Sequence, residues 1–409
     1  MNYNVDIAVI GGGASGLVSA ITAKRTNPNL SVYIFEALDR VGKKLITTGN
    51  GRCNITNKTL DGRFHGEDTD FAFEVLAKEG SDEIRDFFLS IGLPFTYEGD
   101  KAYPASLQAS SVVDCLRFEC ERLGIVTVCG FKVNKIAFGK EFKLSSDTGV
   151  VNAKLVICST GLYSGGEKLG SDGSFFRLLK DHGFKTVKLS PSIVQLKTET
   201  DFVKQLKGIK VDALATLLKN KKPLKSEFGE VLFCDYGLSG PAILNISRDA
   251  LRTEGNFEVM LDLYPNISKG EIEEILIARA KTLSQRKLED FFTGMLNKRL
   301  GQVILKACSY SLQTEVKSLT DNDFKAIAGA LKGFTFKVLG NTGFINSQAT
   351  AGGISTDEFS SVCLMSKRMK GLFACGELLD IDGDCGGFNL TWAWASGLLA
   401  GRKCAEYLR

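Results

Sequence analysis

The sequence predicts an α/β fold with a mostly parallel sheet, and three stretches lead to this prediction. Val5–Ile10 is a short apolar run rich in β-branched residues, followed by a glycine-rich turn, a helical stretch and an apolar strand at 31–35. Residues 155–161 contain another apolar strand. Residues 371–375 contain a third, which leads through glycines into a helix at 390–407. Continuous apolar runs that alternate with helices are typical of buried parallel strands.

The turn after the first strand carries the pattern G-x-G-x-x-G at Gly11, Gly13 and Gly16. In this pattern the first glycine allows a tight turn, the second lets a pyrophosphate approach the backbone, and the third lets the helix pack close to the strand. The helix start at Ala14 and Ser15 offers unpaired N–H groups and a positive dipole end, which favour a phosphate. We therefore predict a Rossmann-type βαβ unit that binds a dinucleotide; a glycine-rich turn without a ligand is the alternative.

Glu36 ends the second strand, about 20 residues after the glycines, where the fingerprint places an acid. Its carboxylate can accept both hydroxyls of an adenosine ribose and would repel a 2′-phosphate. Thr160-Gly161 follows the strand in 155–161, so we expect it at the same edge of the sheet, again facing the dinucleotide.

Residues 37–57, ALDRVGKKLITTGNGRCNITN, are polar, rich in glycine and too irregular for a helix. We expect Lys43, Lys44 and Arg52 to supply positive charge near the pyrophosphate, and Gly51 to let the backbone approach it; an ordinary surface loop is the alternative. Cys53 is a weak candidate for a redox role. A turn that needs a small side chain is the simpler interpretation, because a nucleophilic cysteine needs a depressed pKa.

Composition excludes several classes of protein. The chain has 409 residues, 44% of them hydrophobic and 24% charged, with a net charge of +4, which is typical of a soluble globular protein. No basic tail or alternation of aromatic and basic residues indicates nucleic-acid binding. With no signal peptide and no apolar run long enough to span a bilayer, we expect a cytoplasmic protein without a membrane partner, acting on a small molecule as a monomer or small homo-oligomer.

Eleven cysteines, an odd number without a C-x-x-C pair, indicate a reducing compartment with mostly buried thiols. His65 and His182 are the only histidines, so neither a zinc site nor a Ser-His-Asp triad is expected. Asp380, Asp382 and Asp384 lack EF-hand spacing and are expected in a solvated acidic loop. No metal site is predicted.

The chain between the two ends divides into three predicted parts. Up to residue 191, helices are expected over 71–92, 110–123 and 174–182, strands over 125–137, 141–151 and 153–158, and a loop or hairpin over 97–108. Residues 192–264 are predicted as strands without long helices between them, which indicates an antiparallel barrel or sandwich. Helices follow over 272–283, 288–295, 299–307 and 323–331, and a strand over 332–339. The predicted domains are 1–191 with 345–409, a β domain of 192–264 with 332–344, and a helical subdomain of 265–331.

The last seventy residues or so predict a second ligand-facing turn. Residues 346–356 form a polar glycine-rich loop, and the strand at 371–375 leads into Gly376-Glu377. Gly386 and Gly387 clear space before a helix, whose first N–H groups, at Phe388, Asn389 and Leu390, suit the N1/O2 edge of a flavin. Glu377 would hold ribityl or pyrophosphate-linked hydroxyls. Because an extended dinucleotide can reach from one turn to the other, FAD is the predicted cofactor, and NADH or NADPH would visit as a transient reductant.

The chain resembles the flavoproteins that include the BaiN-type bile-acid reductases and the aminoacetone oxidases. The resemblance rests on DIAVIGGGASG (6–16), GKKLITTGNGRCNITN (42–57), FCDYGLSGPAILNIS (233–247), QATAGGIST (348–356) and GLFACGELLDIDGDCGGFNLTWAWASGLLAGR (371–402). It implies a discontinuous FAD domain, an inserted β-barrel and a helical lid, with the Val133 backbone holding adenine. The other residues implied to line the FAD are Gly11, Gly13, Ser15, Gly16, Glu36, Arg52, Thr160, Gly376, Glu377 and Gly387 to Leu390.

Two activities follow from the resemblance. One is NAD(P)H-driven reduction of a conjugated double bond in a steroid-like substrate, which we favour because the inserted domain offers a wall for an apolar pocket. The other is oxidation of a small amine with oxygen as acceptor. A non-catalytic FAD-binding sensor or interaction protein stays a third hypothesis. Tyr236 is a weak candidate for the proton donor, with a packed core tyrosine as the alternative.

Overall fold

The computed structural model describes residues 1–408, which divide into two compact units: 1–191 together with 344–408, and 192–343. Each unit has its own hydrophobic core. None of the described helices is long and apolar enough to cross a membrane.

The first unit is built on a seven-stranded sheet with the order β7-β2-β1-β10-β9-β8, in which β19 also pairs with β10. Its parallel strands are β7 (Val126–Cys129), β2 (Val32–Glu36), β1 (Asn2–Ile10), β10 (Gly149–Cys158) and β19 (Leu372–Ala374). Strands β9 (Phe142–Ser146) and β8 (Lys135–Phe138) are antiparallel. The predicted mostly parallel sheet is therefore confirmed. Ile10 pairs with Cys158 at the ends of β1 and β10, so the loops that follow these two strands leave the same edge.

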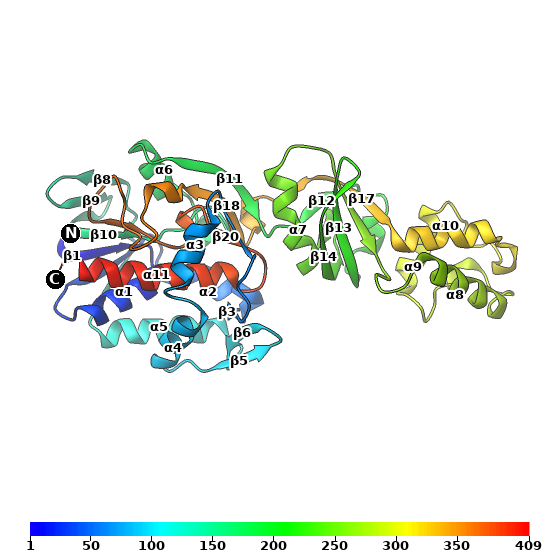
Figure 1. Cartoon of the computed structure of the whole chain (residues 1–409), viewed down its shortest axis with the longest axis horizontal. Helices are drawn as coiled ribbons and strands as arrows, with labels where there is room; N and C mark the ends of the chain where they lie inside the picture. The colour runs from blue at the N-terminus through cyan, green and yellow to red at the C-terminus, as the bar shows by residue number, and fades with distance from the viewer. Residues whose placement is uncertain (409) are drawn as a thin grey trace. The chain divides into compact units, whose positions relative to one another are not determined.

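Helices α1 (Ala14–Thr26) and α11 (Phe388–Glu406) lie side by side against this sheet, although they come from opposite ends of the chain (Figure 1). A Cβ at Gly397 would lie 2.7 Å from the Ser15 carbonyl oxygen, and one at Gly401 would lie 2.2 Å from that of Ser19. Only glycine permits such a close approach of two helix backbones. The close packing fixes the first half of α1 against the second half of α11.

The rest of the first unit differs in places from the sequence-based expectations. One predicted helix over 71–92 is wrong: α3 (Thr69–Leu76) and α4 (Ser81–Ser90) are separate, because Gly80 starts a new helix whose Glu83 carboxylate accepts the Gly80 N–H at 2.9 Å. Residues 37–57 contain a short helix, α2 (Lys43–Thr47), and residues 346–356 contain a buried strand, β18 (Ala349–Ile354), where only loops were expected. The remaining elements are β3 (Thr56–Asn57), β4 (Phe64–His65), β5 (Phe95–Glu98), β6 (Lys101–Pro104), α5 (Ala109–Arg122), α6 (Ser174–Asp181), β11 (Thr186–Ser192) and β20 (Asp382–Gly383).

The second unit contains the predicted antiparallel barrel, which is closed and has the strand order β12-β15-β14-β13-β16-β17. Its strands are β12 (Leu196–Thr198), β13 (Lys210–Lys219), β14 (Lys222–Phe233), β15 (Gly237–Ser239), β16 (Phe257–Asp262) and β17 (Phe334–Asn341). The expectation of no long helix between these strands is wrong, since α7 (Pro241–Arg252) packs its apolar face on the barrel.

Three helices, α8 (Lys269–Thr282), α9 (Lys298–Ala307) and α10 (Asp321–Lys332), lie together at one end of the barrel (Figure 1). Their buried side chains form one core with those of the barrel. The predicted helix over 288–295 is wrong, because only a 3₁₀ turn forms at Leu288–Asp290.

Candidate dinucleotide site

The three glycines of the first turn meet three different surroundings. Gly11 has a φ of +98°, and a Cβ there would lie 2.8 Å from the Ser159 carbonyl oxygen. A Cβ at Gly16 would lie only 2.0 Å from the Gly11 carbonyl oxygen. A Cβ at Gly13, by contrast, would meet no other part of the described chain within 4 Å, its own neighbours and helix backbone aside. The space in front of the first turn of α1 is therefore open, as an approaching pyrophosphate requires.

Glu36 is 9% exposed and is held by backbone groups at the tip of β2. Its Oε2 accepts the Gly12 N–H at 2.7 Å, and its Oε1 accepts the Leu38 N–H at 2.9 Å. The Phe131 N–H bonds to the Glu36 carbonyl at 2.9 Å, which brings the segment leading to the buried Val133 to the same strand end. These bonds orient the carboxylate beside the first glycine turn.

Lys44 and Glu377, which are far apart in the sequence, form an ion pair at 2.6 Å. The Glu377 carboxylate also accepts the Ser164 hydroxyl at 2.7 Å and the Thr350 N–H at 2.5 Å. Lys44 donates to Ser164 as well. A Cβ at Gly161 would lie 3.7 Å from Glu377 Oε2, so the loop after β10 lies against this network. Gly161, Lys44 and Glu377 are thus brought together, while Thr160 lies at the first glycine turn, where a Cβ at Gly11 would be 3.0 Å from its Cα.

Two other predicted cationic residues are engaged elsewhere. Lys43 pairs with Asp39, four residues earlier in the chain, at 2.6 Å. Arg52 pairs with Glu98, which lowers the pKa of that carboxyl, and its guanidinium lies 4.4 Å from the centre of the Tyr103 ring. In this arrangement Lys44 is better connected to the predicted site than Lys43 is. Gly51 has open space around its Cβ position.

The second glycine turn touches the first. A Cβ at Gly376 would lie 2.5 Å from the Ser15 hydroxyl, and the Trp392 indole N–H donates to the Gly376 carbonyl at 3.0 Å. Asn389 closes the turn onto Gly383 through two hydrogen bonds of 3.0 and 2.7 Å. Gly387 is the N-cap of α11, and Gly386 precedes it; Phe388 and Leu390 belong to the first turn of that helix. The two helix N-termini therefore belong to one continuous site.

The two weak catalytic candidates lie in different units and have different surroundings. The Cys53 side chain is fully buried, and burial raises the pKa of its thiol to about 12, so it stays protonated at neutral pH. Tyr236 belongs to the second unit, in the turn between β14 and β15. Burial, together with a hydrogen bond involving Cys234, raises its pKa.

The expectation of a solvated acidic loop is wrong. Asp380, Asp382 and Asp384 are 1%, 0% and 6% exposed. Asp384 lies 3.1 Å from Arg63 and 2.8 Å from His65, because β20 pairs with β4. This arrangement could not be read from the sequence, since the partners come from opposite ends of the chain. Among residues 1–408, no group of three or more His, Cys, Asp or Glu side chains is placed to hold a metal ion.

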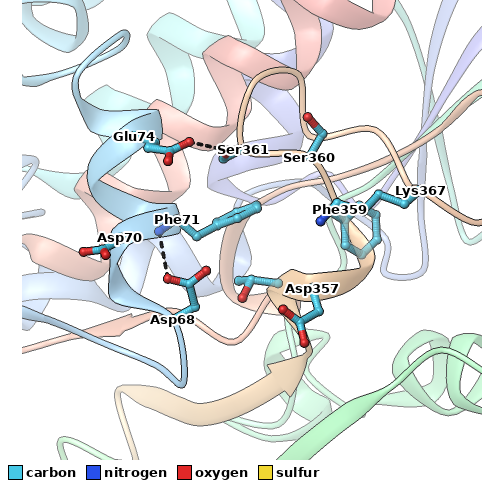
Figure 2. A pocket seen from close by; sticks show the side chains of 10 residues that line it. Asp68, Asp70, Phe71, Glu74, Asp357, Phe359, Ser360, Ser361 and Lys367 are labelled. Carbon is cyan, nitrogen blue, oxygen red and sulfur yellow. Dashed lines mark hydrogen bonds between the residues drawn. The ribbon is translucent and has the colours of Figure 1, made fainter.

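A separate pocket lies between the start of α3 and the loop after β18 (Figure 2). Asp68 accepts the Phe71 N–H at 3.3 Å, and the Ser361 hydroxyl donates to Glu74. The residues lining it are Asp68, Asp70, Phe71, Glu74, Thr356, Asp357, Phe359, Ser360, Ser361 and Lys367. Four carboxylates in this lining make it a poor place for a pyrophosphate, and it contains none of the predicted cofactor residues.

Comparison with known proteins identifies the family. The family model described as HI0933-like protein Rossmann domain matches residues 5–403. The chain belongs to this HI0933-like family of FAD-dependent Rossmann proteins. It is accordingly an FAD-dependent oxidoreductase, as the sequence predicted.

Curated relatives match over nearly their whole length. The chain is 35% identical over 405 residues to the 3-dehydro-bile acid delta(4,6)-reductase of Clostridium scindens, covering 98% of this chain and 99% of the relative. It is 26% identical over 403 residues to the ribosomal RNA dihydrouridine synthase of Haemophilus influenzae, covering 95% of each. A quinol-fumarate reductase structure is similar in fold, with a TM-score of 0.50 at 15% identity, covering 99% of this chain and 71% of that one.

The described residues of this HI0933-like chain fit an FAD in two places. The open space at Gly13 suits the pyrophosphate, and the start of α11 faces a buried side-chain oxygen, Asn54 Oδ1, that has no hydrogen-bond partner in the described chain. A buried acceptor without a donor indicates a missing partner.

Proposed function

We propose that this protein uses NADH or NADPH to reduce a carbon–carbon double bond conjugated with a carbonyl, in a small steroid-like substrate. The observation that carries the proposal is the 35% identity to a bile-acid delta(4,6)-reductase along almost the whole of both chains. The second relative, the ribosomal RNA dihydrouridine synthase of Haemophilus influenzae, is named for making dihydrouridine. In dihydrouridine the ring double bond conjugated with a carbonyl is saturated. Both names therefore describe reduction of the same type of bond.

The bound flavin supplies hydride transfer at N5. In this proposal the chain's own residues hold and orient the dinucleotide. Gly13 and the N–H groups after it receive the pyrophosphate, and Glu36 receives the adenosine ribose. Lys44 pairs with the Glu377 carboxylate and holds it against the loop around Gly161 at the edge of the sheet.

An anaerobic half-reaction experiment tests the proposal. The flavin band of the purified holoprotein should bleach when NADH or NADPH is added and recover when a 3-keto steroid with conjugated double bonds follows. The reduced steroid should be identified by mass spectrometry. No bleaching with either nucleotide, combined with oxygen consumption and peroxide formation in the presence of aminoacetone or related amines, would replace the reductase by an amine oxidase. Inertness in both assays would favour a non-catalytic FAD-binding role.

A second candidate substrate is a uridine in ribosomal RNA, which the 26% identity to a dihydrouridine synthase supports. The composition argues against it, because basic and acidic residues nearly balance, with 51 Lys and Arg against 47 Asp and Glu. Deleting the gene and measuring dihydrouridine in ribosomal RNA separates the two substrates. Loss of this modification, restored by the wild-type gene, would overturn the steroid proposal.

A further inference from the structure

Asn54 is a buried residue whose side-chain oxygen is left without a partner. The residue is 9% exposed, and within residues 1–408 no donor reaches its Oδ1. A Cβ at Gly387 would lie 2.8 Å from this oxygen, so it points at the N-cap of α11. Burying an amide oxygen without a hydrogen bond is unfavourable, so a ligand donor at this position would remove that cost.

The residues that follow hold Asn54 in place. The Ile55 N–H bonds to the Ala102 carbonyl at 2.8 Å, and the Trp394 indole N–H donates to the Ile55 carbonyl at 3.0 Å. Thr56 and Thr391 share a hydrogen bond of 2.9 Å between their hydroxyls. The Asn57 amide donates to the Gly386 carbonyl at 3.1 Å. The segment is thus tied by two side-chain bonds to α11 and by a third to Gly386, just before the helix, so Asn54 Oδ1 is pre-positioned beside the helix start.

The start of α11 supplies the complementary groups. The helix has 19 residues, and its N-cap, Gly387, has no side chain with which to bond the first N–H groups. The N–H groups at the first positions of a helix have no partner within the helix. The first N–H groups of α11 are therefore hydrogen-bond donors that lie next to a single acceptor, Asn54 Oδ1. An imide, in which one N–H is flanked by two carbonyl oxygens, matches this pattern.

We propose that Asn54 Oδ1 accepts the N3–H of the flavin's pyrimidine ring while the first N–H groups of α11 donate to a neighbouring carbonyl oxygen of that ring. Asn54 then acts as a binding and orienting residue for the cofactor. The inference rests on FAD binding by this family and not on the steroid substrate. Its failure can therefore be told apart from failure of the proposed reaction.

The test compares FAD with N3-methyl-FAD, which lacks the N3–H. Apoprotein is titrated with each cofactor, and the two values of Kd are compared. For the wild type, N3-methyl-FAD should bind at least tenfold more weakly than FAD. For Asn54→Ala, FAD should lose at least tenfold in affinity, and the difference between the two cofactors should largely disappear. Equal binding of both cofactors by the wild type would overturn the proposal and leave Oδ1 bonded to a buried water only.

Asn57→Ala is the matched control, because Asn57 lies in the same segment and its side chain bonds the chain's own backbone, donating to the Gly386 carbonyl and accepting the Thr59 N–H. This variant should weaken the binding of FAD and of N3-methyl-FAD by the same factor, so the ratio of the two Kd values should stay as in the wild type. If Asn54→Ala does not fold, the isosteric Asn54→Asp variant takes its place. Asn54→Asp retains an acceptor and adds a negative charge, so it should keep the discrimination and bind reduced flavin about tenfold less well relative to oxidised flavin. That change lowers the two-electron midpoint potential by about 30 mV. An unchanged potential would contradict the placement of Asn54 at the pyrimidine ring.

Discussion

The two glycine turns of the first unit both end at a helix N-terminus, but their surroundings differ. In front of α1, a Cβ at Gly13 would enter open space. In front of α11, a Cβ at Gly387 would collide with Asn54 and the backbone at Thr56. The first turn is thus a general phosphate-binding device made from one local βαβ unit. The second is a closed site assembled from residues 54–57 and 376–391. Residues 54–57 form a wall beside the start of α11, and in our proposal the Asn54 side chain on this wall recognises the flavin ring.

This difference indicates a division of labour along the cofactor. Backbone N–H groups at an open helix start bind a phosphate whatever is attached to it. A fixed side-chain acceptor next to helix donors selects the pattern of hydrogen-bonding groups on a ring. Changes at the first turn should therefore alter affinity for dinucleotides in general, whereas changes at the second should alter the discrimination between flavins and the relative binding of oxidised and reduced flavin.

The largest effect is expected from Gly16→Ala. A Cβ here would lie 2.0 Å from the Gly11 carbonyl oxygen and 2.6 Å from the Ser159 hydroxyl, so α1 must move away from the sheet. Because α11 packs on α1, the movement would disturb both turns. We expect the free energy of unfolding to fall by about 3 kcal/mol, measured by urea denaturation of the apoprotein. Stability equal to that of the wild type would show that the two helices are not rigidly coupled.

Gly13→Ala is the matched variant at the same turn. No described atom opposes its Cβ, and its φ of −84° suits alanine, so apoprotein stability should stay within about 0.5 kcal/mol of the wild type. The methyl group would stand where the pyrophosphate is proposed to approach. We expect the Kd for FAD to rise at least tenfold, about 1.4 kcal/mol, in a fluorescence titration. An unchanged Kd would mean that the phosphates bind elsewhere.

Helices α1 and α11 are each anchored by an ion pair to a glutamate. The two glutamates should affect stability in opposite ways as the pH changes. Hydrogen bonds from Arg122, and also from Arg25 of α1, lower the pKa of Glu119. Burial raises the pKa of Glu79, which pairs with Arg402 of α11 at 2.8 Å. In the unfolded chain the pKa of a glutamate is about 4.3. Because folding lowers the pKa of Glu119, this residue stabilises the fold above about pH 4.3, and that stability is lost as the pH falls. Folding raises the pKa of Glu79, so the stability that this residue contributes declines as the pH rises above about 4.3.

Urea unfolding between pH 4 and 7 measures this difference. The loss of stability in Glu119→Gln should grow with pH, on the order of 1 kcal/mol, whereas the loss in Glu79→Gln should shrink. Parallel curves for the two variants would show that burial does not distinguish the two anchors.

The sequence predicted the parts of the molecule whose partners are close along the chain. The first βαβ unit, with Glu36 at its second strand end, has the predicted order, and the barrel was predicted from strands at short spacing. Errors occurred where local patterns compete with tertiary contacts. Residues 349–354 look polar and loop-like, yet they are a strand with every residue buried. The pairs Lys44–Glu377 and His65–Asp384 were missed because no local pattern links residues so far apart.

The smallest effect is expected at Cys53, which lies at the base of the second turn's wall beside Asn54. Its thiol has a pKa of about 12 and is fully buried, so it neither ionises at neutral pH nor meets solvent. Cys53→Ser replaces it with a side chain of similar size, and we expect turnover and FAD affinity within about twofold of the wild type, since no step requires a thiolate. Steady-state turnover together with a flavin titration would measure this. A loss of a hundredfold or more in turnover with FAD affinity unchanged would show that Cys53 reacts directly, and the wall would then be part of the chemistry as well as part of the binding site.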